Sequence, residues 1–255
     1  GKYDADGDRL WSKNLGRDDY EAPRRILLAE DGTLVLVGAT KSSWDADAPI
    51  ADGDDGDIFI AAFDSDGEEL WARQYGSTGY ETPLDATMDS LTGDIYVSGF
   101  TNRDLAGEYL GGGTDGFLLA LDAEGNWLWA DPIATPAWEQ AMDMALTADG
   151  NIVVTAMGDA PFGDTASGAG GLAILEYTPD GIRQSAIQYS EGLVSVVTED
   201  AMIDPDTGCF YLIGATGSDI ARERPGSDDD IILMTFQYPS AMPAEEPTDA
   251  TESAE

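Results

Sequence analysis

Histidine is absent from the 255-residue sequence, and cysteine occurs once, at Cys209. Without histidine the chain cannot use Ser-His-Asp or Cys-His catalysis, and it cannot bind zinc or haem through imidazole. A single cysteine excludes an intrachain disulfide. Cys209 lies in the apolar run GCFYLIG, which predicts a buried residue on a strand. The Gly-rich loops that bind dinucleotides or nucleoside triphosphates are missing too.

Positive charge is scarce. Twelve Lys and Arg residues stand against 50 Asp and Glu residues, which gives a net charge of −38. No basic patch is available to neutralise phosphates, so the composition excludes nucleic acid as a partner and argues against an anionic membrane surface. No apolar run approaches the roughly 18 residues needed for insertion into a bilayer. The excess of Asp and the near absence of Lys predict a salt-adapted or seawater protein, with a calcium-rich surface protein as the alternative.

A turn of the type found in DSDGEELWARQYG (64–76) recurs along the chain. Its copies begin at Asp4, Asp64, Asp122 and, in a degenerate form, Thr178. Seven positions after the start of each of the first three copies is a tryptophan: Trp11, Trp71 and Trp129. The repeated unit is about 56 to 60 residues long, a period typical of β-propellers.

Each copy predicts four short strands. In the second unit, the apolar run 57–63 is followed by a tight turn and by 69–75, and then by 84–90 and 94–100, where apolar and polar residues alternate. No segment has a convincing helical period. The sequence therefore predicts an all-β protein: a β-propeller of four units, each a four-stranded antiparallel blade.

The first residues, 1–3, align with 61–63, and the last strand-like run, 228–236, aligns with the strands that we expect to be innermost. We therefore expect the C-terminal strand to complete the first blade and close the ring, as propellers do. An arc completed by a second copy and a fragment of a longer chain remain alternatives. Residues 1–236 are predicted to form the propeller, and 237–255, rich in Pro, Ala, Glu, Thr and Ser, a disordered tail.

The pattern FDSDGEELWARQYGSTGYE…GDIYVSGFT resembles the bacterial SBBP β-propeller repeat, and the match extends over about residues 1–236. It is weakest in the fourth unit, which lacks the tryptophan. The pattern is also similar to the tryptophan-bearing repeats of quinoprotein propellers. The resemblance implies a secreted or cell-surface protein, and it implies no common activity.

Calcium is the metal that this composition favours, because it binds clustered carboxylate oxygens. The densest cluster is WDADAPIADGDDGD (44–57), and within it Asp52, Asp54 and Asp57 are the candidate ligands. A solvated acidic loop is the alternative. Trp44, in the same loop, is the candidate for an exposed ligand contact such as sugar stacking.

Asp57, Asp115, Gly171 and Asp230 open the four strands that we expect to be innermost. Three carboxylates near the mouth of a central channel would attract a cation and raise one another's pKa. Asp115 and Asp230 are therefore further candidate metal ligands, with capping of a turn as the alternative. The repeated tryptophans are expected to pack blade against blade.

These observations predict a non-enzymatic, extracellular or cell-surface module that binds protein or carbohydrate, with self-association as a further option. No catalytic residue and no cofactor besides Ca²⁺ is predicted. Two alternatives stay open: a subunit of a surface layer or filament, and a carboxylate- or cation-dependent polysaccharide lyase or hydrolase.

Overall fold

The computed structural model describes residues 1–17, 19–44, 56–106, 109–162, 170–189, 196–204, 206–216 and 230–237. Within these residues every regular element is a β-strand, as the sequence predicted, and no helix is long and apolar enough to cross a membrane. The strands are β1 (Lys2–Tyr3), β2 (Arg9–Trp11), β3 (Glu21–Leu28), β4 (Leu34–Thr40), β5 (Asp57–Phe63), β6 (Glu69–Tyr75), β7 (Glu81–Met88), β8 (Ile95–Thr101), β9 (Asp115–Leu121), β10 (Trp127–Ile133), β11 (Glu139–Leu146), β12 (Ile152–Gly158), β13 (Gly171–Tyr177), β14 (Arg183–Tyr189), β15 (Val196–Ile203), β16 (Cys209–Thr216) and β17 (Asp230–Gln237).

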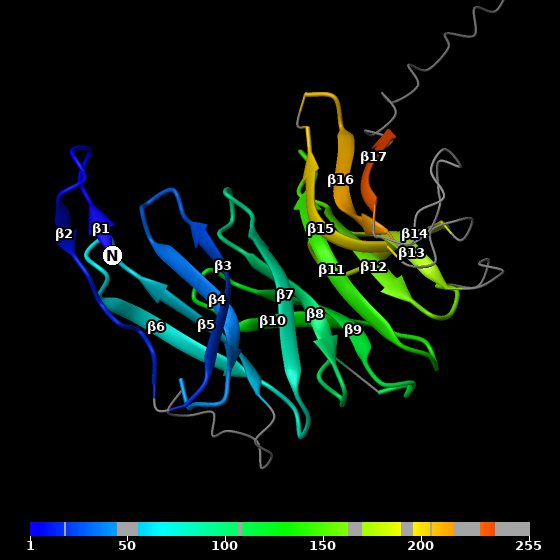
Figure 1. Ribbon diagram of the computed structural model, residues 1–255, viewed down its shortest axis with the longest axis horizontal. Coiled ribbons are helices and arrows are strands. Elements are labelled where there is room, and N and C mark those ends of the chain that lie inside the picture. The colour runs from blue at the N-terminus through cyan, green and yellow to red at the C-terminus, as the bar shows by residue number, and fades with distance from the viewer. Residues whose placement is uncertain are drawn as a thin grey trace, which may run out of the picture.

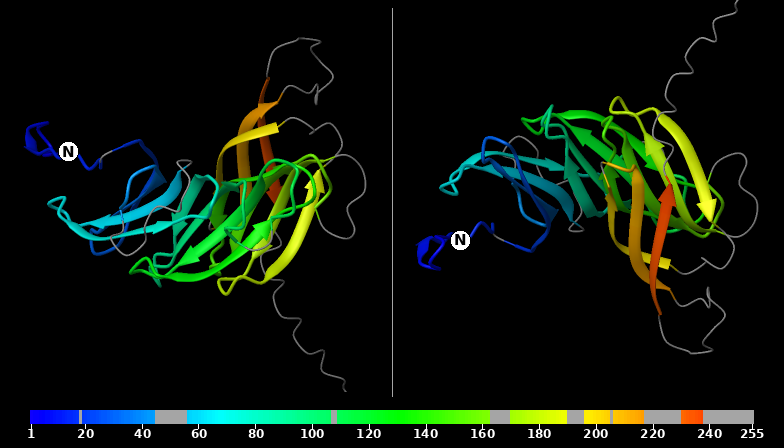
Figure 2. Two further views of the ribbon diagram at one scale, coloured as in Figure 1. Left: turned by 90° about the horizontal axis from the view of Figure 1, so that it is seen from below. Right: turned by 90° about the horizontal axis from the view of Figure 1, so that it is seen from above.

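The strands form antiparallel sheets in chain order. Blade 1 is β3–β6, blade 2 is β7–β10, blade 3 is β11–β14, and blade 4 is the three-stranded sheet β15–β17, while β1 and β2 form a separate hairpin. The blades follow one another along an open arc, with the β1–β2 hairpin at one end and blade 4 at the other (Figures 1 and 2). The all-β propeller architecture is therefore confirmed.

The innermost strands are β3, β7, β11 and β15, because these strands join each blade to the next: β3 contacts β7, β7 contacts β11, and β11 contacts β15. From the sequence we expected β5, β9, β13 and β17 to be innermost, which is wrong. The compact apolar run 57–63 suggested a central position, but second and third strands are covered on both faces by adjacent blades. Innermost strands face the axis and retain polar residues.

Apolar layers between the blades form the core. Val37, Ile58 and Ile60 of blade 1 pack against Val97 and Leu119 of blade 2, and all five are 0% exposed. Equivalent layers lie between blades 2 and 3 and between blades 3 and 4. Burial of apolar area at about 25 cal/mol per Å² makes these layers the main source of stability.

The repeated tryptophans occupy like surroundings. Each packs on the glycine of the turn that begins the next unit: Trp11 on Gly67, Trp71 on Gly125 and Trp129 on Gly181. All three glycines have positive φ values, 76°, 77° and 86°. The predicted role in packing blade against blade is confirmed.

The predicted ring closure is not found. β17 pairs with β16, β1 pairs with β2, and no sheet of the described residues joins β1 to β17. β1 and β17 each correspond to the third strand of a blade. β17 therefore cannot supply a strand that the β1–β2 hairpin lacks.

Candidate functional site

The innermost strands bring four charged residues together near the axis. Arg25, Asp85, Asp143 and Asp200 lie on β3, β7, β11 and β15, each at or beside a β-bulge in its strand. A bulge turns a side chain out of the regular alternation, and bulges are frequent beside active sites. We call these four residues the axial cluster.

Asp85 is held by hydrogen bonds on both carboxylate oxygens. Its Oδ1 accepts from Arg25 Nε and from the Ala86 N–H at 2.7 Å, and its Oδ2 accepts from the Met144 N–H at 2.9 Å. The side chain is 8% exposed, and Arg25 neutralises its charge. Asp85 therefore fixes the Arg25 guanidinium and joins blade 2 to blade 3.

Asp143 has a different environment, although it is equally buried. Its pKa is raised to about 6: burial is the main cause and the negative charges of Asp85 and Asp200 add to the rise, whereas a hydrogen bond from Thr198 and the positive charge of Arg25 oppose it. Arg25 Nη2 is 3.9 Å from Asp143 Oδ1, a weaker contact than the Arg25–Asp85 pair. Asp143 Oδ2 has no hydrogen-bond partner. Asp143 can therefore hold a proton near neutral pH.

The cluster is open on one side. Asp200 is exposed and the Arg25 side chain is 37% exposed, whereas Thr155 and Thr198, which support Asp143 from behind, are buried. Thr155 Oγ1 accepts from the Asp143 N–H at 3.0 Å and lies 3.2 Å from Thr198 Oγ1. One buried carboxyl that can be protonated and one exposed carboxylate thus share an axial site, the arrangement that acid–base chemistry requires.

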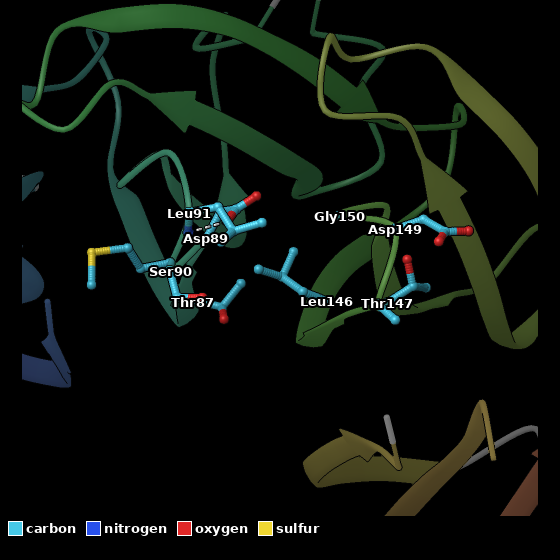
Figure 3. A pocket seen from close by; sticks show the side chains of 10 residues that line it. Thr87, Asp89, Ser90, Leu91, Leu146, Thr147, Asp149 and Gly150 are labelled. Atoms are coloured by element: carbon cyan, nitrogen blue, oxygen red, sulfur yellow. Dashed lines mark hydrogen bonds between the residues drawn. The ribbon is translucent and has the colours of Figure 1, made fainter. Parts of the chain in front are cut away.

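A hollow of about 390 Å³ lies where β7 and β11 end (Figure 3). The hairpins 87–91 and 146–150 form its two sides, with Leu91 and Asp89 on one and Leu146, Thr147 and Asp149 on the other. Because strands rise about 3.3 Å per residue, the hollow begins roughly 7 Å from Asp85 along β7 and roughly 10 Å from Asp143 along β11.

Of the five predicted metal ligands, only Asp57 and Asp115 have side chains that the structure describes. Asp52 and Asp54 lie outside the described residues, and so does the side chain of Asp230. Asp57 and Asp115 begin third strands away from the axis, where burial raises the pKa of each. Asp57 accepts a hydrogen bond from Gln74 Nε2 at 2.7 Å, and Asp115 from the Leu110 N–H at 2.7 Å. Among the described residues no three acidic or Cys side chains form a group suited to a metal, and the calcium site remains a prediction.

Trp44 is buried, at 6% exposed, so its predicted exposure is wrong. Its ring stacks on Phe59 with centroids 4.4 Å apart, and the Arg17 guanidinium lies 4.4 Å from the ring centroid. It covers the apolar face of blade 1 that is turned away from blade 2, together with Leu15.

A second set of buried carboxylates begins the innermost strands. Glu81 accepts hydrogen bonds from the Ser77 N–H at 3.0 Å and from Thr101 Oγ1 at 2.8 Å, and Glu139 accepts from the Thr135 N–H at 2.9 Å. Burial raises the pKa of both Glu81 and Glu139. These hydrogen bonds hold the connectors between blades in place. The two glutamates therefore have a structural role.

The axial cluster was missed in the sequence, although the repeats contained the signal. Counted from the start of their units, Arg25, Asp85 and Asp143 occupy the same repeat position, and Asp200 falls one position later in the fourth unit. The mistaken choice of innermost strand directed attention to Asp57 and its equivalents instead.

No family model matches the chain. Regulatory protein FlaEY of Caulobacter vibrioides is 24% identical over 242 residues, a match that spans 90% of this chain and 23% of the relative. Among solved structures, the Hadza microbial sialidase Hz136 has a TM-score of 0.50 at 14% identity, over 86% of this chain and 46% of the sialidase. An α-L-arabinanase of Penicillium chrysogenum has a TM-score of 0.44 at 12% identity, over 83% of this chain and 75% of that chain.

These comparisons correct one prediction. From the sequence we expected a chain that is not an enzyme, whereas the solved structure with a TM-score of 0.50 is named as an enzyme, a sialidase. The expectation of a non-enzymatic module is therefore withdrawn. At these identities the likeness itself shows the fold, a β-propeller, and the chain spans less than half of the sialidase.

Proposed function

We propose that the chain is the catalytic segment of a carbohydrate-cleaving hydrolase, with the axial cluster as its active site. The supporting observation is the pair Asp143 and Asp200, on adjacent innermost strands: the first is buried with a pKa near 6, the second is exposed. Glycoside hydrolysis uses two carboxyl groups, one protonated and one ionised, and different environments assign the two roles.

The chemistry assigns a role to each of the three carboxyl groups of the cluster. Protonated Asp143 donates its proton to the glycosidic oxygen while the bond from that oxygen to the anomeric carbon breaks. Water adds to the anomeric carbon, and the Asp200 carboxylate accepts the proton that this water loses. Asp85 is a positioning residue, because both of its oxygens are already hydrogen-bonded and it holds Arg25 beside the site.

The hollow between hairpins 87–91 and 146–150 supports a substrate longer than one sugar, because it lies at the ends of the two strands that carry Asp85 and Asp143. A polysaccharide could contact both places at once. Cleavage of such a polymer also fits the extracellular or cell-surface location that the sequence predicts.

The test is release of reducing sugar from a panel of neutral and acidic polysaccharides and a sialylated oligosaccharide. Asp143→Asn and Asp200→Asn should each lower kcat by about 10²- to 10⁴-fold, the usual contribution of general acid–base catalysis. Asp66→Asn, a change at an exposed turn far from the axis, is the matched control and should keep full activity. No release by the unaltered chain, or equal rates for Asp143→Asn, would contradict the proposal.

The pH profile is a second check. A general acid must be protonated, so kcat/KM should fall as the pH rises through about 6, the pKa of Asp143. Asp143→Asn should abolish that limb of the profile.

A regulatory segment of a longer protein is the second candidate, favoured by the 24% identity with Regulatory protein FlaEY over 90% of this chain. That role predicts an axial cluster that contributes to stability only, and therefore no sugar release by any variant or by the unaltered chain.

A further inference from the structure

The peptide group that precedes Asp143 is held at both ends by buried hydroxyls. The pairing of β11 with β12 is irregular around Asp143, so this peptide group lies in a bulge. Its carbonyl oxygen, on Met142, accepts a hydrogen bond from Ser98 Oγ of β8 at 2.7 Å. Its N–H, on Asp143, donates to Thr155 Oγ1 of β12 at 3.0 Å. Hydroxyls from two blades therefore fix the backbone that carries Asp143.

The repeat shows that the fold itself does not need hydroxyls here. The residues that face one another across the first and second strands are Arg25 and Val37, Asp85 and Ser98, and Asp200 and Ile213. In blade 3, Thr155 faces the bulge at Asp143. Blades 1 and 4 thus have an aliphatic side chain where blades 2 and 3 have a hydroxyl. Since burial of a hydroxyl is unfavourable unless it is hydrogen-bonded, Ser98 and Thr155 are best explained by the peptide group that they hold.

A third hydroxyl completes a ring of hydrogen bonds on Asp143. Thr198, on β15, donates to the Asp143 carboxyl, and its Oγ1 lies 3.2 Å from Thr155 Oγ1. Because Thr198 uses its hydrogen on the carboxyl, Thr155 is the donor in the contact between the two hydroxyls. The ring runs from the Asp143 N–H through Thr155 and Thr198 to the Asp143 carboxyl. It begins and ends on one residue, and it therefore fixes the side chain relative to its own backbone.

We propose that Thr155 and Thr198 are positioning residues for Asp143, and that the ring holds its carboxyl at the axis beside Arg25 and Asp200. The charged groups that face this carboxyl come from three strands, β7, β3 and β15: Asp85, Arg25 and Asp200. Because Thr198 and Asp200 lie on the same strand, β15 sets the separation of the acid and the base. For that consequence in catalysis the inference rests on the proposed hydrolase.

The first test needs no substrate. The pKa of Asp143 is measured in the full chain from the NMR signal of its ¹³C-labelled carboxyl carbon, identified as the signal that Asp143→Asn removes. The hydrogen bond from Thr198 lowers this pKa, so Thr198→Val should raise it from about 6 by about one unit. Thr155→Val removes the donor to Thr198 and should shift the pKa in the same direction. Thr198→Ser keeps the hydroxyl and should restore the value of the unaltered chain.

Thr101→Val is the matched control. Thr101 is 3% exposed, against 4% for Thr198, and it also donates to a buried carboxylate of a first strand, Glu81, at 2.8 Å. This variant should lose comparable stability in urea unfolding and leave the pKa of Asp143 unchanged. Circular dichroism checks that both variants fold.

Activity is the second readout. In Thr198→Val, kcat should fall about 10- to 100-fold with KM nearly unchanged, because a displaced acid weakens binding of the transition state more than binding of the substrate. The alkaline limb of the kcat/KM profile should move upward together with the pKa of Asp143. Thr198→Ser should recover most of the lost rate.

An unchanged pKa of Asp143 in Thr198→Val, or an equal shift in Thr101→Val, would overturn the inference. If the unaltered chain releases sugar while Thr198→Val leaves this pKa unchanged, the positioning role fails and the proposed hydrolase stands. If the pKa shifts as expected and the unaltered chain releases no sugar, the positioning role stands and the proposed hydrolase fails.

Discussion

At the scale of single residues, the axial cluster departs from what a stable core would contain. Asp143 and Asp85 are buried to the same extent, yet only Asp85 has a close cationic partner and hydrogen bonds on both oxygens. A buried carboxylate with an unpartnered oxygen lowers the stability of the folded state when it is ionised. Such a residue is better explained by chemistry at the site than by packing.

Asp143→Asn should therefore stabilise the protein at neutral pH. A folded-state pKa near 6, above the unfolded value of 3.8, means that the folded state binds more protons between these values. Stability is then lost as the pH rises from about 4 through 6, by about 3 kcal/mol for this shift. Urea unfolding should show the variant to be more stable at pH 7.5 and little changed at pH 4. An equal difference at both pH values would refute the assignment.

Gly125→Ala should destabilise the packing between blades 2 and 1. A Cβ at this position would lie 2.5 Å from Trp71 Cζ3, and the backbone has φ +77°, which L side chains rarely adopt. Backbone strain and overpacking together should lower the free energy of unfolding by about 2–4 kcal/mol. Gly32 has a similar φ of +89°, but a Cβ there would have no atom within 4 Å. Gly32→Ala should therefore lower the free energy of unfolding only by the cost of the backbone strain. If thermal unfolding showed the same loss of stability for Gly125→Ala and Gly32→Ala, overpacking against Trp71 would be excluded as a cause.

At the scale of elements, the close approach of first and second strands limits the side chains of the second. Gly99→Ala on β8 would bring a Cβ into overlap with the Thr82 carbonyl oxygen and within 2.8 Å of the Phe117 ring. We expect a loss of about 1–3 kcal/mol in the free energy of unfolding. Blade 3 has Ala156 at the same register, paired with Ala173 in place of the phenylalanine. Ala156→Gly should cost about 1 kcal/mol or less, and a smaller loss for Gly99→Ala than for this control would contradict the explanation.

The strands themselves could be predicted because the apolar and turn patterns are local. The run 57–63 and the turn after it gave the hairpin β5–β6 with its bounds unchanged, and the repeat extended this to every unit. The radial order of strands is not a local property. It depends on which strand faces the axis, and a strand covered by blades on both faces looks the same in sequence as one at the centre.

The axial cluster could not be assembled for the same reason. Its members are separated in sequence by a whole repeat unit, and they meet only because four bulges turn them toward one axis. The shared offset showed that Arg25, Asp85 and Asp143 are equivalent, but equivalent positions meet only if they lie on innermost strands. A correct choice of that strand would have predicted the site from the repeat alone.

At the scale of the whole molecule, charge is the property that dominates. A net charge of −38 makes the folded state repel itself. Outside the axial cluster, the described ion pairs are Lys13 with Glu68 at 2.6 Å and Arg17 with Glu69 at 2.7 Å, both between the N-terminal segment and blade 1. Exposed pairs of this kind contribute little, about 0–1 kcal/mol. Screening by salt must therefore provide most of the relief from repulsion.

Sodium chloride should raise the Tm steadily between 0.05 and 1 M, because the Debye length falls from above 10 Å to about 3 Å over this range. If the acidic loop that contains Asp52 and Asp54 binds calcium, CaCl₂ should raise the Tm further than NaCl at equal ionic strength. Asp52→Asn combined with Asp54→Asn should remove only that additional increment, because one pair of charges among 50 acidic residues changes the general repulsion slightly. Scanning calorimetry in both salts separates the two effects. Coincident curves for the two salts would show that screening alone accounts for the stabilisation, and the calcium prediction would then be wrong.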